Sequence, residues 1–208
     1  YEIYQCDWSS DVCSSDLHRV AGETTWRETA WGDVDPQADF TRVVKLTGLK
    51  PGTRHEVVID ARPTGGDAPT SSLEGAFNTA PLPAASAGAA FAVMSCQQYE
   101  DLDRPDGLAI YPSMLRGRPD FMINTGDVVY YDHGPVHALN ETLARYHWAR
   151  MYALPTLRDF HRQSGAFFMR DDHDTLTDDS RPGERTGDLD RKSTRLNSSH
   201  TDISRMPS

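Results

Sequence analysis

Three shortages in this sequence exclude several classes of protein before any motif is considered. Only three cysteines occur in 208 residues, an odd and small number that gives no disulfide framework. No apolar run approaches the roughly 18 residues that a membrane-spanning helix needs. Basic residues are scarce, because 21 Lys and Arg stand against 31 Asp and Glu, for a formal net charge of -10. This excess of acid argues against a nucleic-acid binder, since phosphate backbones attract Lys and Arg.

The composition that remains is that of a globular protein. The hydrophobic share of 38 % is on the low side but is enough for a folded core. The length allows one large domain or two modest ones. We expect a monomer with no membrane span and no nucleic-acid partner. The acidic balance is compatible with phosphate chemistry, because a bound cation inverts the local field of a site rich in Asp.

The two ends of the sequence differ from its middle. Residues 1–17 and 191–208 are rich in Ser and lack a sustained hydrophobic period of 2 or 3.6 residues. Both resemble translated sequencing-adapter sequence, and the alternative is a pair of native disordered tails. We leave both out of the predicted fold. The sequence begins at Tyr1 rather than Met and shows no secretory leader, so we expect that the natural start is missing. If residues 191–208 are not native, we expect that the protein was cut near Asp190.

Residues 18–80 predict a small all-β sandwich. Short stretches of β-branched and apolar residues are separated by turn residues, most clearly Pro51-Gly52. The predicted strands are residues 40–46, 55–61 and 75–79. Residues 81–88, rich in Pro and Ala, predict a linker to a second domain.

Residues 89–190 predict an α/β domain with a mostly parallel sheet covered by helices. Apolar runs typical of strands buried on both faces alternate with helical segments. The predicted strands are residues 91–95, 121–125 and 166–169, and the predicted helices are residues 106–116, 140–154 and 156–163. Asn140 is the predicted cap of the longest helix, and Pro155 is predicted to end it.

Polar side chains follow each of these predicted strands directly. They are Cys96, Gln97 and Gln98 after the first, Gly126, Asp127 and Tyr130 after the second, and Asp171, Asp172, His173 and Asp174 after the third. Since ligands bind at the carboxyl ends of strands in open α/β sheets, we expect the three groups to meet at one edge. Thiolate, carboxylate, phenolate and imidazole groups together favour a cation site with hard and soft ligands.

Each group also has a simpler interpretation. Cys96 can be an inert buried thiol, Asp127 a turn cap and Tyr130 a core residue with a wet hydroxyl. Residues 171–174 can be a solvated acidic turn. Four ionisable groups directly after an apolar strand, however, carry a repulsion and desolvation cost that a cation relieves. This cost favours the metal site.

Together the three segments resemble the alkaline phosphatase D (PhoD-like) family of calcineurin-like metallophosphoesterases. The segments are residues 91–101, 120–132 and 167–175. The Gly-Asp-x-x-Tyr element at residues 126–130 is also similar to that of purple acid phosphatases. Residues 18–80 resemble fibronectin type III modules, which often precede the phosphatase domain in this family. The resemblance covers residues 18–189.

The resemblance implies an exported, metal-dependent hydrolase of phosphate esters, an alkaline phosphatase or phosphodiesterase that uses two cations to activate an attacking hydroxide. Cys96 and Tyr130 would bind Fe³⁺. Asp127 would bridge Fe³⁺ to a second divalent ion, Ca²⁺, and Asp172 would bind that second ion. His173 is the implied catalytic residue, placed at the phosphate or its leaving oxygen.

The sequence departs from the family pattern in two places. Asp174 stands where many relatives carry Glu, and the Gly-His-x-His-like element that supplies further ligands in relatives is missing. We therefore expect this chain to be inactive alone, although its parent protein is a hydrolase. Two alternatives stay open. One is a non-catalytic extracellular β-sandwich module with an incomplete phosphatase-like remnant, and the other is a different metal hydrolase with the same strand-end arrangement.

Overall fold

A computed structural model describes residues 12–36, 40–85, 88–180, 184–186 and 189–190. The predictions for residues 1–11 and 191–208 lie outside these ranges. The chain divides into two compact units, Tyr1–Ala89 with Arg162–Gly165, and Ala90–His161 with Ala166–Ser208. No helix in the described part of the chain is both long enough and apolar enough to cross a membrane.

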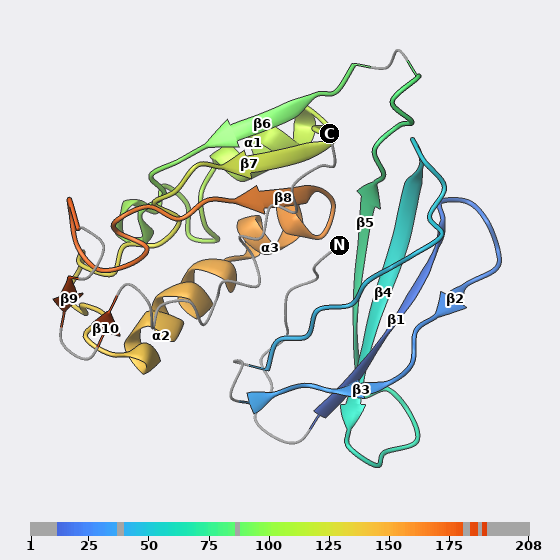
Figure 1. The fold of residues 1–208 in the computed structure, drawn as a ribbon, viewed down its shortest axis with the longest axis horizontal. Coiled ribbons are helices and arrows are strands. Elements are labelled where there is room, and N and C mark those ends of the chain that lie inside the picture. Colours follow the sequence, from blue (N-terminus) through green and yellow to red (C-terminus); the bar gives the residue numbers. More distant parts are fainter. Residues whose placement is uncertain (1–11, 37–39, 86–87, 181–183, 187–188, 191–208) are drawn as a thin grey trace. The chain divides into compact units, whose positions relative to one another are not determined.

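The first unit is built on one antiparallel sheet. Its strands are β1 (Val12–Val20), β2 (Arg27–Glu28), β3 (Gly32–Asp33), β4 (Arg54–Pro63) and β5 (Ser71–Asn78). Their order is β2-β1-β4-β5, and β3 also pairs with β1, so β1 and β4 are the central strands (Figure 1). The predicted second layer of a sandwich is not found among the described residues of this unit, whose strands all belong to the one sheet.

The start of this sheet differs from the prediction. We expected regular structure to begin at His18, but β1 begins at Val12 and pairs with β4 along its whole length. The middle of β1, residues 14–16, is polar and shows no alternation of apolar and polar side chains. Hydrogen bonds to a neighbouring segment stabilise it. The Asp16 N–H donates to Thr29 Oγ1 at 2.9 Å, and the Thr29 N–H donates to the Asp16 carbonyl at 2.9 Å.

The predicted strand at residues 40–46 is wrong. The segment forms only an isolated bridge between Asp35 and Thr41. Phe40 has a φ of 55°, which interrupts an extended chain. The next residue but one, Arg42, turns its guanidinium to the carbonyl oxygens of Ser14 and Ala30. The Arg42 side chain therefore binds backbone carbonyls of β1 and of the segment between β2 and β3, where the β-branched pattern predicted a backbone ladder.

The second unit confirms the predicted mixture of strands and helices. In chain order its main elements are β6 (Phe91–Met94), α1 (Ile110–Arg116), β7 (Phe121–Asn124), α2 (Glu141–Tyr152), α3 (Pro155–His161) and β8 (Gly165–Phe168). Short elements also occur, at η2 (Tyr99–Asp101), β9 (Arg185–Thr186) and β10 (Leu189–Asp190). The sheet order is β6-β7-β8, and β6 and β7 are parallel with Phe91 opposite Phe121. In Figure 1 the arrows of β6 and β8 point the same way.

The helix boundaries follow from capping and proline. Asn140 Oδ1 accepts a hydrogen bond from the Leu143 N–H at 3.0 Å, which confirms the predicted cap of α2. Pro155 opens α3, where its missing N–H costs nothing because the first turn leaves N–H groups unpaired anyway. For the same reason Pro112 is tolerated as the third residue of α1.

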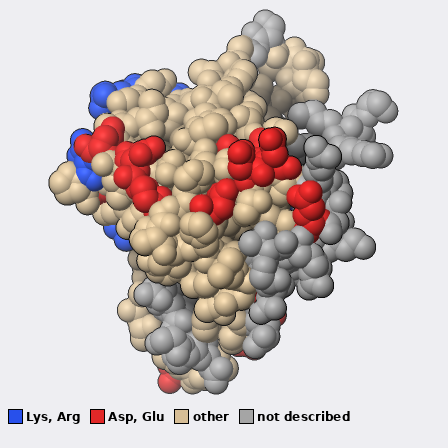
Figure 2. Space-filling model, turned by 90° about the vertical axis from the view of Figure 1, so that its left-hand side faces the viewer, with Lys and Arg blue, Asp and Glu red and all other residues tan. Residues whose placement is uncertain are grey.

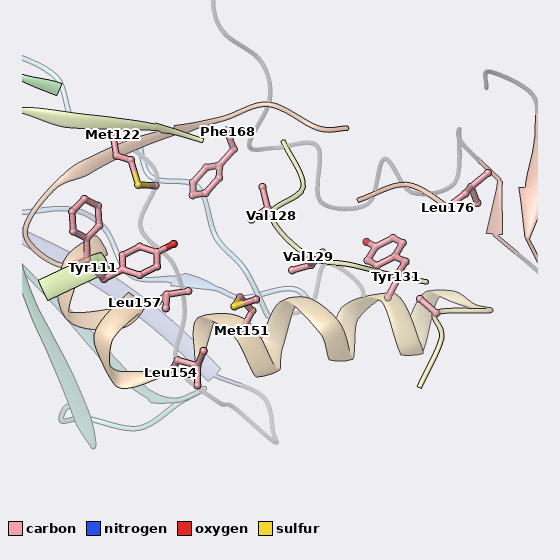
Figure 3. Packing of buried hydrophobic residues seen from close by; sticks show 13 residues of the cluster. Tyr111, Met122, Val128, Val129, Tyr131, Met151, Leu154, Leu157, Phe168 and Leu176 are labelled. Carbon is pink, nitrogen blue, oxygen red and sulfur yellow. The ribbon is translucent and has the colours of Figure 1, made fainter. Parts of the chain in front are cut away.

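One face of the β6-β7-β8 sheet packs against the helices. Met122 and Phe168 from the sheet pack with Tyr111, Met151 and Leu157, all of them buried (Figure 3). Each fully buried apolar side chain of this kind contributes about 1.5–3 kcal/mol. The loop after β7 belongs to the same core through Val128 and Val129. This packing fixes the loop on which the predicted site residues lie.

The opposite face of the sheet carries apolar side chains that are half exposed. The exposed fractions are 53 % for Phe91, 58 % for Val93 and 53 % for Phe167. Phe121 lies between the two other rings, with ring centroids 5.3 Å from Phe91 and 5.6 Å from Phe167. The prediction of strands buried on both faces is therefore wrong for β6. In β6 only every second residue, Ala92 and Met94, faces the core, and a continuous apolar run does not indicate this.

Replacing Phe167 by Lys is expected to lower the binding of a hydrophobic fluorescent dye and the self-association of the chain. The reason is that a contiguous exposed apolar patch promotes association. Dye fluorescence and sedimentation velocity measure the two effects. Leu139→Lys, at a residue that is 49 % exposed, is the matched control and should change little. Equal dye binding by wild type and Phe167→Lys would contradict the prediction.

His161 makes the second unit sensitive to acid. It lies among the rings of Tyr111, Tyr152 and Phe168, and its Nε2 is buried without a hydrogen-bond partner in the described structure. Burial lowers the pKa of His161 to about 4 from the usual 6.5. As the pH falls, His161 therefore becomes protonated in the unfolded chain before it does so in the folded chain. The free energy of unfolding decreases by up to about 3 kcal/mol as the pH falls from about 6.5 towards 4.

A His161→Phe variant is expected to lose this part of the acid sensitivity. Urea unfolding of the wild type and the variant at about pH 7 and about pH 5 measures the difference in pH dependence. His137→Phe, at an exposed histidine, is the control and should keep the dependence of the wild type. Parallel loss of stability in wild type and His161→Phe would contradict the prediction.

Candidate metal centre

The loops that follow β6 and β7 are joined directly beyond the strand ends. The Cys96 N–H donates to the Gly126 carbonyl at 3.3 Å, and the Gln97 N–H donates to the Asp127 carbonyl at 3.0 Å. The parallel pairing of the strands thus continues into the loops. This places Cys96 and Asp127, both predicted as ligands, side by side.

Both of these loops hold unusual backbone conformations. Cys96 has a φ of 57° and Asp127 a φ of 52°, in the left-handed region that costs a non-glycine residue roughly 1–2 kcal/mol. Gly126 has a φ of 116°, and a Cβ there would lie 2.6 Å from the Cβ of Asp171 in the third loop. Glycine is therefore required for the loop after β8 to approach. Strained residues that the surroundings hold in place are typical of functional sites.

The five predicted site residues come together around Asp127. Its Oδ2 lies 3.5 Å from Cys96 Sγ and accepts a hydrogen bond from the Tyr130 hydroxyl at 3.4 Å. Asp127, Asp172 and His173 each offer a ligand atom within 4.8 Å of the others. The strand-end rule thus predicted that these loops meet at one edge of the sheet.

The chemistry of this donor set fits a cation. The second carboxylate oxygen of Asp127, Oδ1, is buried and has no hydrogen-bond partner in the described part of the chain. A buried oxygen of this kind is costly unless something satisfies it. Burial, followed by the neighbouring Cys96 and Asp127, raises the pKa of Tyr130. Its phenol therefore stays protonated near neutral pH unless a positive charge displaces the proton.

His173 is held by a carboxylate that the sequence did not single out. Its Nδ1 lies 2.8 Å from Asp132 Oδ1, and both side chains are only 12 % exposed. Burial alone would lower the pKa of His173, but the hydrogen bond to Asp132 and the charges of Asp127 and Asp172 outweigh it, so the pKa is raised. With Nδ1 donating to Asp132, Nε2 is the nitrogen that remains for a ligand or substrate.

Asp132 is in turn fixed from two sides. Its Oδ2 accepts the Asp178 N–H at 3.0 Å, and its Oδ1 lies 3.3 Å from Nδ1 of His133. Asp132, His133 and His173 form a second group whose ligand atoms lie within 4.8 Å of one another. The only sequence feature that could have indicated Asp132 is its place in the loop that also carries Asp127. Its partner His173 is 41 residues away.

Asp174 is a structural residue of the site. It is fully buried and accepts the Val129 N–H at 2.7 Å and the Asp171 N–H at 3.2 Å. Burial raises the pKa of Asp174 to about 7. The carboxyl group thereby joins the loop after β8 to the loop after β7. Its contacts are to backbone groups, and it lies in none of the groups that could hold an ion among the described residues.

Acidic side chains gather on this side of the second unit. Figure 2 views the molecule from the side towards which the β6 and β8 arrows point in Figure 1, and Asp and Glu form a band there. The exposed Asp178 and Asp179 belong with Asp172 to a third group of carboxylates. A concentration of negative charge at the carboxyl ends of the strands attracts cations to this edge.

The fold and the site together define an α/β protein with carboxylate and histidine groups at its strand ends that could hold a cation. A match to a family model identifies the family to which this protein belongs. Residues 91–201 match the PhoD-like phosphatase model, which is more than half of the chain, and the chain belongs to this family.

Among solved structures, a chain titled "Structure of PhoD" is similar, with a TM-score of 0.74 and 17 % sequence identity. The match covers 96 % of this chain and 41 % of that one, so the present chain spans less than half of that protein's length. At this identity the likeness concerns the fold. No curated protein matches the chain.

Proposed function

We propose that the strand-end site belongs to a hydrolase of phosphoric esters that works with two bound cations. The observation that carries the proposal is the donor set around Asp127, whose buried Oδ1 has no partner within the described structure. Membership of the PhoD-like phosphatase family supports a phosphate ester as the substrate. Whether that ester is a monoester or a diester is decided by the experiment below.

Cys96, Tyr130 and Asp127 would hold Fe³⁺, and Asp127 and Asp172 would hold a divalent ion, Ca²⁺. The assignment follows from the family resemblance, and ligand chemistry is compatible with it, because thiolate and phenolate suit a transition metal and carboxylate oxygens suit Ca²⁺. When bound, the cations would supply a hydroxide near neutral pH and would neutralise charge on the phosphate.

His173 would serve as the proton donor to the leaving oxygen. Its Nδ1 is engaged by Asp132 at 2.8 Å, so the ring cannot turn without losing that hydrogen bond. The raised pKa of His173 favours the protonated ring, which is the form that a general acid needs. The ring also lies against Tyr130, with centroids 4.4 Å apart, which limits its tilt.

We infer that this chain alone has little or no activity and that a longer parent protein supplies the remaining ligands. The 208 residues contain no Gly-His-x-His-like element. We also propose that the first unit, whose described strands form one sheet, is part of a fibronectin type III-like module, and that the parent protein is exported. The turn before β4 supports the module, since Gly52 there has a φ of 59° and leads into an antiparallel pair.

Hydrolysis of an aryl phosphate monoester and an aryl phosphate diester by the parent protein tests the proposal. We expect metal-dependent hydrolysis that a chelator removes, and loss of it in the double variant Cys96→Ala, Asp127→Ala. Activity of wild-type level in the double variant would rule out the proposed site. A parent protein without hydrolysis of either ester would favour the non-catalytic module.

A further inference from the structure

We propose that Gln97 is a positioning residue that locks the Cys96 and Asp127 turns in the conformations in which both side chains face one cation. The proposal rests on the proposed function, because these two turns carry the ligands named there. Gln97 itself is 4 % exposed and touches neither the Cys96 thiol nor the Asp127 carboxylate through its side chain. It acts through the backbone of the loops.

The contacts of Gln97 join the loops to each other and to the core. Its backbone N–H donates to the Asp127 carbonyl at 3.0 Å, and its Nε2 donates to the Val128 carbonyl at 2.9 Å. Its Oε1 accepts a hydrogen bond from the hydroxyl of Tyr111, a fully buried residue of α1. Gln97, the residue after Cys96, therefore binds the backbone carbonyls of both Asp127 and Val128.

These contacts matter because both turns are strained. The left-handed conformations of Cys96 and Asp127 would relax if nothing held them, since each costs roughly 1–2 kcal/mol for a non-glycine residue. The Cys96 N–H bond to the Gly126 carbonyl, at 3.3 Å, is the only other backbone bond between these two turns in the described structure. Gln97 therefore supplies two of the hydrogen bonds that keep the turns paired, one from its backbone N–H and one from its side chain, and the side-chain bond is the one that a substitution removes.

The neighbouring Tyr111 offers a matched control. Gln97→Met keeps the size of the side chain but removes the bond to the Val128 carbonyl, together with the bond from Tyr111. Tyr111→Phe removes a hydrogen bond in the same buried place but leaves Gln97 bound to Val128. A purely structural role predicts similar effects of the two variants on the turns. A positioning role predicts that only Gln97→Met alters them.

The first test needs no metal. NMR coupling constants and Cα shifts of Cys96 and Asp127 in the chain report their φ angles. We expect left-handed values in the wild type and in Tyr111→Phe, and a shift towards averaged values in Gln97→Met. If Gln97→Met does not fold, Gln97→Asn keeps the amide but is too short for Val128 and takes its place. Unchanged φ values in the folded variant would overturn the proposal.

The second test measures equilibrium binding of Co²⁺ through its thiolate absorption. We expect Gln97→Met to bind about tenfold more weakly than the wild type, as is usual when a residue that orients ligands is lost. Tyr111→Phe should bind as the wild type does, and equal weakening in both variants would overturn the proposal. Absence of Co²⁺ binding by the wild type would count against the proposed metal centre, while the φ angles would still decide the role of Gln97.

Discussion

Replacing Asp127 by Ala is expected to weaken cation binding by this chain about 100-fold or more. Asp127 is the residue to which the other donors converge, with Cys96 Sγ at 3.5 Å, the Tyr130 hydroxyl at 3.4 Å and Asp172 in the same group. Without the Asp127 carboxylate, the remaining donor atoms lose the negatively charged ligand that lies between them. Loss of a ligand exceeds the 10–100-fold effect usual for residues that only orient ligands. Equilibrium dialysis against Co²⁺ measures the change.

Asp178→Ala is the control for this experiment. Asp178 is also an aspartate near Asp172, but its side chain is 81 % exposed, and its Oδ1 lies 3.7 Å from His173 Nε2. We expect its loss to leave Co²⁺ affinity almost unchanged. Retention of wild-type affinity in Asp127→Ala, or a greater loss in Asp178→Ala, would show that the ion binds at the exposed carboxylates.

Replacing Asp174 by Leu is expected to lower the free energy of unfolding of the second unit by about 3 kcal/mol. The substitution leaves the N–H groups of Val129 and Asp171 without their acceptor. Val129 is buried, and a buried unpaired donor costs about 1–3 kcal/mol. Urea unfolding followed by circular dichroism measures the loss.

The exposed Asp178→Leu serves as the comparison for Asp174→Leu and should stay within about 0.5 kcal/mol of the wild type, as surface substitutions usually do. A similarly small effect of Asp174→Leu would mean that the buried carboxyl group does not hold the loop. Asp174 belongs to none of the groups in the described structure that could hold a metal. The Asp174→Leu experiment therefore measures the contribution of this residue to stability and not to ion binding.

Sequence patterns predicted the features of this fold that depend on local chemistry. The α2 cap at Asn140, the strands near residues 91, 121 and 166, and the meeting of Cys96, Asp127 and Asp172 at one sheet edge all follow from propensity and the strand-end rule. The meeting point was predictable because parallel strands bring their following loops together whatever the loops contain, whereas the role of each residue stays a prediction.

Features that depend on distant partners were missed or wrong. Asp132 and Asp174 act on groups 41 and 45 residues away, and no local pattern indicates such a contact. The polar middle of β1 forms hydrogen bonds with Thr29 through Asp16, which a hydrophobic period cannot show. Burial of β6 was overestimated because an apolar run does not say whether one face or both faces are covered.

The position of a bound ion tests the central claim most directly. Anomalous diffraction from crystals of this chain grown with Fe³⁺ or Co²⁺ locates the metal without reference to activity. We predict a peak within bonding distance of the Asp127 carboxylate and Cys96 Sγ. A peak only among Asp172, Asp178 and Asp179, or no peak at saturating metal, would contradict the proposed centre.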